Sequence, residues 1–113
     1  MPYIEVKTNK HVSEEKAQRI ANAMGRLISI LPGKTEKWLM TEVKGDCFMT
    51  FAGSDAPCVL VNVSLFGKAP EEAYEKLTAA ICEELRWTLD IVEEKMYVKY
   101  EEVSHWGWNK TNF

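Results

Sequence analysis

The feature that most constrains the fold is an internal repeat, in which the second half of the chain copies the apolar pattern of the first. With a shift of 57 positions, apolar residues fall on apolar residues in the pairs Ile20 and Leu77, Met24 and Ile81, Ile28 and Leu85, and Leu39 and Met96. Each half, about 2–43 and 59–100, has the pattern of a strand, a helix and a second strand. Such a unit makes a right-handed crossover between parallel strands. The sequence therefore predicts one α/β (α+β, two-layer) domain over 1–113, with a four-stranded mixed sheet and both helices on one face.

In the first unit, apolar and polar residues alternate over 2–7, which is typical of a strand. Ser13 is a suitable N-cap for the helix that follows, and Pro32-Gly33 ends that helix. A second strand is predicted over 38–43.

Between the units, a turn and then a short strand are predicted, the strand over 47–51. The run 59–66 is mostly apolar, as expected of a central strand that is covered on both faces. Pro70 fits the first turn of the second helix, and a final strand is predicted over 96–100. Because the helices cover only one face of this sheet, the apolar strands predict that the other face is buried by self-association.

Composition and charge exclude several classes of function. The chain has 113 residues and a formal net charge of -3, with no basic stripe for a nucleic-acid backbone, so we expect no nucleic-acid partner. No run is apolar enough for a signal peptide or a membrane span, so we expect a cytoplasmic protein with no membrane partner, unless it is secreted by a non-classical route. Cys47, Cys58 and Cys82 are too widely spaced for a disulfide framework or a zinc site, and we expect reduced thiols.

Pro2 has two interpretations. Proline has no amide hydrogen to donate to a neighbouring strand, so it is tolerated at the first residue of a strand, where no hydrogen bond of the sheet is lost. Most such prolines have only this structural role. Removal of Met1, which is common before a small residue, would instead leave Pro2 with a free secondary amine at the start of a buried strand. Such an amine could accept and return a proton.

Other candidate residues depend on where the fold places them. Lys34 follows Gly33, where it could simply complement the negative end of the first helix. Tyr97 and Lys99 are two positions apart on one strand and therefore share a face. In a pocket, the two lysines would lower the pKa of a nearby amine, and Tyr97 could donate to a substrate oxygen.

Metal, thiol and serine chemistry have weak support. His11 and His105 each lack a second ligand at metal spacing, so no metal is proposed. Val61 occupies the position that would complete a Cys-x-x-Cys motif with Cys58. Ser64 has no glycine-flanked nucleophile turn.

Several short segments, which occur in order along the whole chain, together match the pattern of a known protein family. They are Met1-Pro2 at the start of a strand, Gly33-Lys34, the segment Phe51-Ala52-Gly53-Ser54-Asp55-Ala56-Pro57-Cys58, Gly67-Lys68, Tyr97, and Gly107-Trp108-Asn109 with Phe113. Together they resemble the macrophage migration inhibitory factor family of the tautomerase superfamily.

The resemblance implies a tautomerase-like fold and a homotrimer with each active site at a subunit boundary. It also implies cofactor-free keto–enol tautomerase activity on small aromatic keto or enol acids of the phenylpyruvate and dopachrome type. Pro2, freed of Met1, would be the catalytic base. The groups that bind substrate would be Lys34, the backbone of Ser64, Leu65 and Phe66, Tyr97 from the neighbouring subunit, and Lys99. The pocket wall would comprise Tyr3, Trp106, Trp108 and Phe113.

The chain also departs from the family pattern. Lys99 stands where cytokine members usually have an asparagine, and this extra cation could favour diacids. Phe66 and Trp106 replace smaller aliphatic residues and should reshape the pocket. Two alternatives stay open: a secreted cytokine that binds a receptor protein and has a vestigial or regulatory pocket, and a hydratase or decarboxylase. The latter chemistry usually recruits arginines, and Arg19, Arg26 and Arg86 all fall on the predicted helices.

Overall fold

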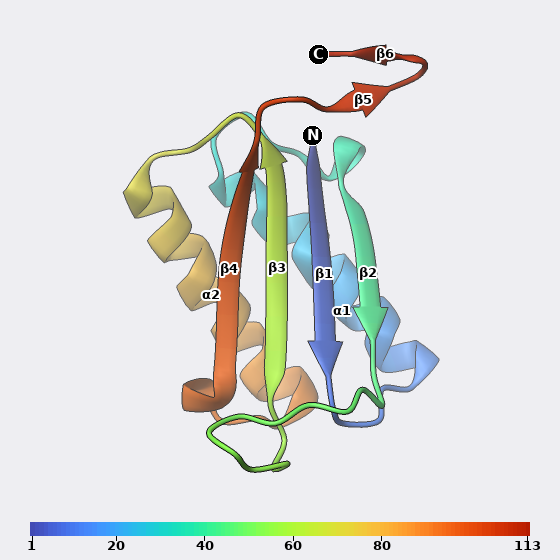
Figure 1. Ribbon diagram of the computed structural model, residues 1–113, viewed down its shortest axis with the longest axis vertical. Coiled ribbons are helices and arrows are strands. Elements are labelled where there is room, and N and C mark those ends of the chain that lie inside the picture. The colour runs from blue at the N-terminus through green and yellow to red at the C-terminus, as the bar shows by residue number, and fades with distance from the viewer.

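The computed structural model describes residues 1–113, and Figure 1 shows it as one sheet with both helices behind one face. The sheet has the strand order β2-β1-β3-β4. Its strands are β1 (Pro2–Thr8), β2 (Met40–Lys44), β3 (Val59–Phe66) and β4 (Met96–Val103). The helices are α1 (Glu14–Leu27) and α2 (Glu71–Leu89), and the chain ends in a hairpin of β5 (Gly107–Trp108) and β6 (Thr111–Asn112).

The directions of the strands confirm the predicted mixed sheet. β1 and β2 are parallel and are connected through α1, while β3 and β4 are parallel and are connected through α2. The two units meet at the centre of the sheet, where β1 and β3 are antiparallel. Both β1 and β3 are therefore internal strands, and β2 and β4 form the two edges.

The core lies between the sheet and the helices. The helix residues that define the sequence repeat are all fully buried, namely Ile20, Met24, Ile28, Leu77, Ile81 and Leu85. Alternate residues of β1 and β3 meet them from the sheet, including Ile4 and Val63. Burying one such side chain contributes about 1.5–3 kcal/mol to the stability of the fold. The residues of the repeat therefore supply a large share of the hydrophobic stabilisation.

The helix ends follow from local sequence. The Ser13 hydroxyl accepts a hydrogen bond from the Lys16 backbone N–H at 3.1 Å, which confirms the predicted N-cap. The longer helix α2 begins after Pro70 and ends at Asp90, whose φ of 54° is left-handed. Neither helix combines the length and the apolar content that crossing a bilayer requires.

The predictions for 38–43, 47–51 and 96–100 need correction. Residues 36–38 form a 3-10 turn, so β2 begins at Met40, and β4 continues to Val103. No strand forms over 47–51, where only Phe51 makes an isolated bridge, to Ser54. The physical reason is that the segment has no continuous partner strand: the Cys47 N–H donates to the Thr8 carbonyl at the very end of β1, and the Met49 carbonyl accepts from the Asn9 side chain.

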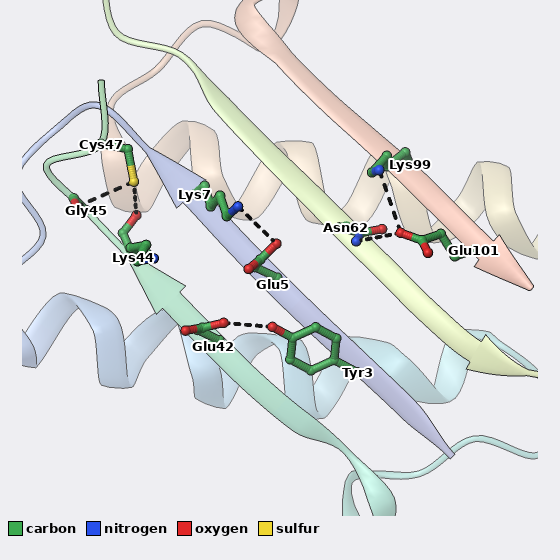
Figure 2. A network of polar contacts seen from close by, with 10 residues as sticks. All are labelled: Tyr3, Glu5, Lys7, Glu42, Lys44, Gly45, Cys47, Asn62, Lys99 and Glu101. Carbon is green, nitrogen blue, oxygen red and sulfur yellow. Dashed lines mark hydrogen bonds and ion pairs between the residues drawn. The ribbon is translucent and has the colours of Figure 1, made fainter. Parts of the chain in front are cut away.

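The expectation of an apolar uncovered face was also wrong. In β3 burial alternates strictly, so only one set of side chains is fully buried, and the other set is mixed: Leu60, Asn62, Ser64 and Phe66. Figure 2 shows charged side chains on this open face, where Lys7 pairs with Glu5 at 3.6 Å. The run 59–66 is apolar enough to suggest that both of its faces are covered. Its two polar residues are two positions apart, however, and therefore lie on the same face, the open one.

Asn9 holds the long loop between β2 and β3 against the end of β1. Its side-chain amide donates to the carbonyls of Asp55 and Ala56 at 3.0 Å each, and to that of Met49 at 3.4 Å. Its side-chain oxygen accepts from the Cys58 N–H at 3.0 Å.

Replacing Asn9 with alanine should therefore lower the free energy of unfolding by about 2–3 kcal/mol, because several backbone groups lose their partner at once. Chemical denaturation monitored by circular dichroism measures the change. Asn22→Ala is the matched control, since Asn22 is exposed on α1 and bonds only to Gln18. Equal stability of the two variants would show that Asn9 does not organise the loop.

Candidate active site

Pro2 begins an internal strand, at the end of the sheet where both chain termini lie (Figure 1). It is buried, and its register partner on β3 is Leu65. The ladder does not need an N–H from this residue, because the Phe66 N–H donates to the carbonyl of Met1 at 3.0 Å. The backbone at this point is thus fixed by Met1 and β3, and the Pro2 nitrogen makes no ladder bond.

Lys34 reaches this end of the sheet from the loop after α1. Gly33, at φ 78°, takes a left-handed conformation that favours glycine, and the chain then turns toward the sheet. The Lys34 ammonium donates to the Phe66 carbonyl at 2.9 Å, so it lies beside the start of β1. Burial and the nearby Lys34 charge both lower the pKa of the Met1 amine below its usual value. An amine at this place is therefore easier to keep neutral.

A cavity of about 540 Å³ opens at the start of β1. Its lining comes from the first three residues, the segment that enters β2 and the C-terminal tail: Met1, Pro2, Tyr3, Lys37, Trp38, Leu39, Met40, Trp106, Gly107 and Trp108. The β5–β6 hairpin lies above the N-terminus in Figure 1 and brings the tail to this place. The cavity has the size expected of a small-molecule site.

Aromatic rings form much of the cavity wall. The Trp38 and Trp108 rings meet edge to face, with centroids 4.9 Å apart, and Trp108 stacks on Phe113 at 6.1 Å. Phe113 also contacts Phe66 at 5.8 Å. Trp38 and Trp108 thus line the cavity itself, and Phe113 connects Trp108 to Phe66 on β3.

Trp38 and Lys37 were missed by the sequence reasoning, which placed residue 38 in a strand. Both belong to the 3-10 turn before β2, and the Lys37 ammonium lies 5.4 Å from the centre of the Trp38 ring. One sequence signal could have found Trp38: it precedes a strand that is parallel to β1. Parallel strands begin at the same edge of a sheet, so a residue just before β2 lies near the start of β1. Lys37 lines the cavity and places a cation at its wall, which suits an anionic ligand.

Tyr3 lines the cavity and also a broader groove of about 820 Å³ on the open face of the sheet. The Tyr3 hydroxyl donates to a carboxylate oxygen of Glu42 on β2 at 2.7 Å, as Figure 2 shows. This hydrogen bond is the main reason why the pKa of Tyr3 rises to about 12. Ser64 lies opposite Tyr3 in the sheet and lines the same groove.

The remaining candidates do not all meet at Pro2. The Leu65 side chain is fully buried in the core, so only its backbone faces the start of β1. Tyr97 is opposite Leu60, five positions along β3 from Leu65, and is therefore about 17 Å from the Pro2 end of the sheet. There the Tyr97 ring contacts Phe51 with centroids 5.0 Å apart.

Lys99 is also remote from Pro2 within the subunit. Its ammonium is 3.6 Å from the Glu101 carboxylate, which also accepts from Asn62 at 2.8 Å (Figure 2). No three His, Cys, Asp or Glu side chains lie together as a possible metal site, and all three cysteines are free thiols. One subunit therefore unites Pro2, Lys34, Phe66 and the aromatic wall, but not Tyr97 or Lys99.

A family model described as macrophage migration inhibitory factor (MIF) matches residues 1–113. The chain belongs to the MIF family. The MIF of Meriones unguiculatus is 29% identical over 118 residues, which cover 100% of this chain and 99% of that protein. The MIF of Mus musculus is 31% identical over 86 residues, covering 72% of each.

Solved structures agree with this assignment to the MIF family. The crystal structure of Leishmania major MIF2 has a TM-score of 0.93 and 28% identity, covering 100% of this chain and 97% of that one. A MIF homologue from Prochlorococcus marinus has a TM-score of 0.89 and 25% identity, covering 98% of both chains. The fold predicted from the resemblance is thus confirmed.

Proposed function

We propose that this MIF-family protein is a cofactor-free keto–enol tautomerase that acts on small aromatic keto or enol acids such as phenylpyruvate and dopachrome-type compounds. The observation that carries the proposal is the position of Pro2, buried at the start of β1 on a cavity with the Lys34 ammonium beside it. Membership of the MIF family supports the assignment. A base, a cation and an aromatic cavity are the elements that such a reaction needs.

The reaction begins once Met1 has been removed and Pro2 carries a free amine. The neutral amine takes a proton from the carbon next to the ketone, and the electrons of that C–H bond form the enolate. Lys34, which has two N–H donors beyond the one used by Phe66, stabilises the enolate oxygen. The Pro2 ammonium then returns the proton to that oxygen, so the product is the enol isomer and nothing else is consumed. The reverse sequence converts enol to ketone.

Binding of the substrate uses both the rings and the cations of the cavity. The aromatic ring would lie among Trp38, Trp106 and Trp108, while Tyr3 and Phe113 would complete the wall. The carboxylate would be attracted by Lys34 and Lys37. The exposed Trp38 and Trp108 rings in particular would be covered by a ligand.

The proposal includes a homotrimer, in which Tyr97 and Lys99 of one subunit reach the cavity of the next. Tyr97 is 63% exposed and remote from Pro2 in its own subunit, and both edge strands of the sheet are free to meet another copy. Sedimentation-velocity analysis at micromolar concentration should give the mass of three 13.0 kDa chains. A monomer would contradict this part of the proposal.

The activity itself is tested with purified protein whose intact mass shows the loss of Met1. Conversion of enol to keto phenylpyruvate, followed by absorbance, should be accelerated well above the buffer rate. Absence of acceleration with the processed, folded protein would overturn the proposed function.

A further inference from the structure

A second cavity opens between α1 and α2, in the helix layer that lies behind the sheet in Figure 1. Its volume is about 230 Å³, and it shares no residue with the cavity at Pro2. A typical small-molecule site is larger, at roughly 300–1,000 Å³, so this space suits a single side chain of a partner. The residues that line the α1–α2 cavity are Arg26, Leu27, Ala80, Glu83, Glu84 and Trp87.

Trp87 forms an exposed aromatic wall of the α1–α2 cavity. Its side chain is 77% exposed, although the next two residues of α2, Thr88 and Leu89, are buried. No other aromatic ring packs against Trp87, and no lysine or arginine of the chain lies over it. Tryptophan is enriched among the residues that dominate protein–protein binding. The face of this ring is therefore available to a partner.

The rim of the α1–α2 cavity carries one unbalanced negative charge. Arg26 lies 3.4 Å from a carboxylate oxygen of Glu84, so these two charges offset each other. Glu83 is exposed and has no ion-pair partner within 4 Å. The rest of α2 strengthens the negative field, because the helix has five glutamates against one lysine and one arginine. The charge that complements this surface is positive.

The ring and the free carboxylate are placed so that one cation can contact both. Glu83 and Trp87 are four residues apart on α2 and are therefore neighbours on one side of the helix. Ala80 and Leu27 provide an apolar floor on which an aliphatic stem can lie. Arginine suits this arrangement better than lysine, because its planar guanidinium stacks on an aromatic ring and donates two parallel hydrogen bonds to a carboxylate.

We propose that the α1–α2 cavity binds an arginine side chain in a basic segment of a partner protein. The guanidinium lies on the Trp87 ring and donates to the Glu83 carboxylate. This interaction is separate from the proposed catalysis, because no residue of the cavity at Pro2 takes part. It is also compatible with the proposed homotrimer, which uses the edge strands of the sheet and not the helices.

Two peptides of equal length test the site on the full-length protein. One is acetyl-Ala-Leu-Arg-Ala-Leu-Arg-Ala-amide, and the other has citrulline in place of both arginines, which keeps the shape of the side chain and removes its charge. Binding is followed by two-dimensional NMR of ¹⁵N-labelled protein, in which the Trp87 indole signal is assigned by its loss in Trp87→Leu. The arginine peptide should shift this signal saturably and bind at least about 5-fold more tightly than the citrulline peptide.

Glu83→Gln and Trp87→Leu remove the two contacts one at a time. Each should weaken binding of the arginine peptide about 3-fold or more, followed in Trp87→Leu by the backbone signal of Ala80. Glu83→Gln should also bring the two peptides to within about twofold of each other. Glu75→Gln, which is exposed on α2 about two turns before Glu83, is the matched control and should bind as the wild type does.

Equal affinity for the two peptides, a shift that does not saturate, or an affinity that Glu83→Gln and Trp87→Leu leave unchanged would overturn the proposal. A second copy of the chain is the competing occupant. If sedimentation velocity without peptide shows an assembly that Trp87→Leu disrupts, the cavity is a self-association surface and the proposal is wrong. Circular dichroism of the variants should match that of the wild type, since both substituted side chains are exposed. The peptides bind without substrate, so the result does not depend on tautomerase activity.

Discussion

Inserting one alanine between Met1 and Pro2 is expected to lower kcat/KM for phenylpyruvate at least about 100-fold, the usual contribution of a positioned general base. The insertion converts the Pro2 nitrogen into a tertiary amide, which cannot accept a proton. The cavity residues stay unchanged, so the loss should appear mainly in kcat. The measurement is steady-state ketonisation of enol phenylpyruvate with protein whose terminus has been verified by intact mass.

Pro2→Gly provides the comparison for the insertion. It leaves a free amine at nearly the same place, but a more flexible one, so a smaller loss of about 10-fold is expected. Near-native circular dichroism of both proteins would exclude unfolding as the cause. Full activity of the insertion protein would show that Pro2 is not the base.

The second large effect is expected from Lys34→Ala, which should lower kcat/KM about 100-fold. Lys34 lies beside the start of β1, where its charge lowers the pKa of the Met1 amine, and removal of one donor from a developing enolate costs that order of rate. The variant should also move the pKa of the base upward, because a neighbouring positive charge no longer penalises the ammonium form. A pH–rate profile of the variant separates these two effects.

Lys37→Ala is the control for a general loss of positive charge. Lys37 lies over the Trp38 ring and lines the cavity, whereas the Phe66 carbonyl accepts from Lys34. Its removal should raise KM a few-fold and leave kcat nearly unchanged, as for lost attraction of the substrate carboxylate. Similar kcat losses in the two variants would contradict a specific role for Lys34.

The fold could be predicted to a large extent because its core is periodic. Apolar positions of both helices recur at helical spacing, and all six that define the repeat are buried. The secondary-structure predictions were wrong where contacts with distant residues override the local alternation of apolar and polar residues. The segment 47–51 alternates like a strand, yet its backbone is bound by Thr8 and Asn9 from the end of β1. No local pattern reveals such long-range partners.

The site could be predicted only in part. Pro2 and Lys34 are far apart in sequence, and the resemblance indicated their role before the structure placed them together beside Phe66. Trp38 was missed because it resembles an ordinary residue of an edge strand. Its place on the Pro2 cavity depends on the register of β2 against β1, in which Tyr3 lies opposite Met40. Register is fixed by packing and cannot be read from the strand alone.

The most direct test of Pro2 as the base is the pH dependence of kcat/KM for phenylpyruvate with protein that has lost Met1. An amine acts as a base only when neutral, so activity should be full above its pKa and disappear as the pH falls through it. Burial and Lys34 lower the pKa of the Met1 amine, and the same two causes would act on a Pro2 amine that takes its place. We therefore predict a single ascending limb with a pKa below the ordinary value of about 8, shifted upward in Lys34→Ala. A limb at or above 8, or one that the alanine insertion leaves in place, would contradict the assignment.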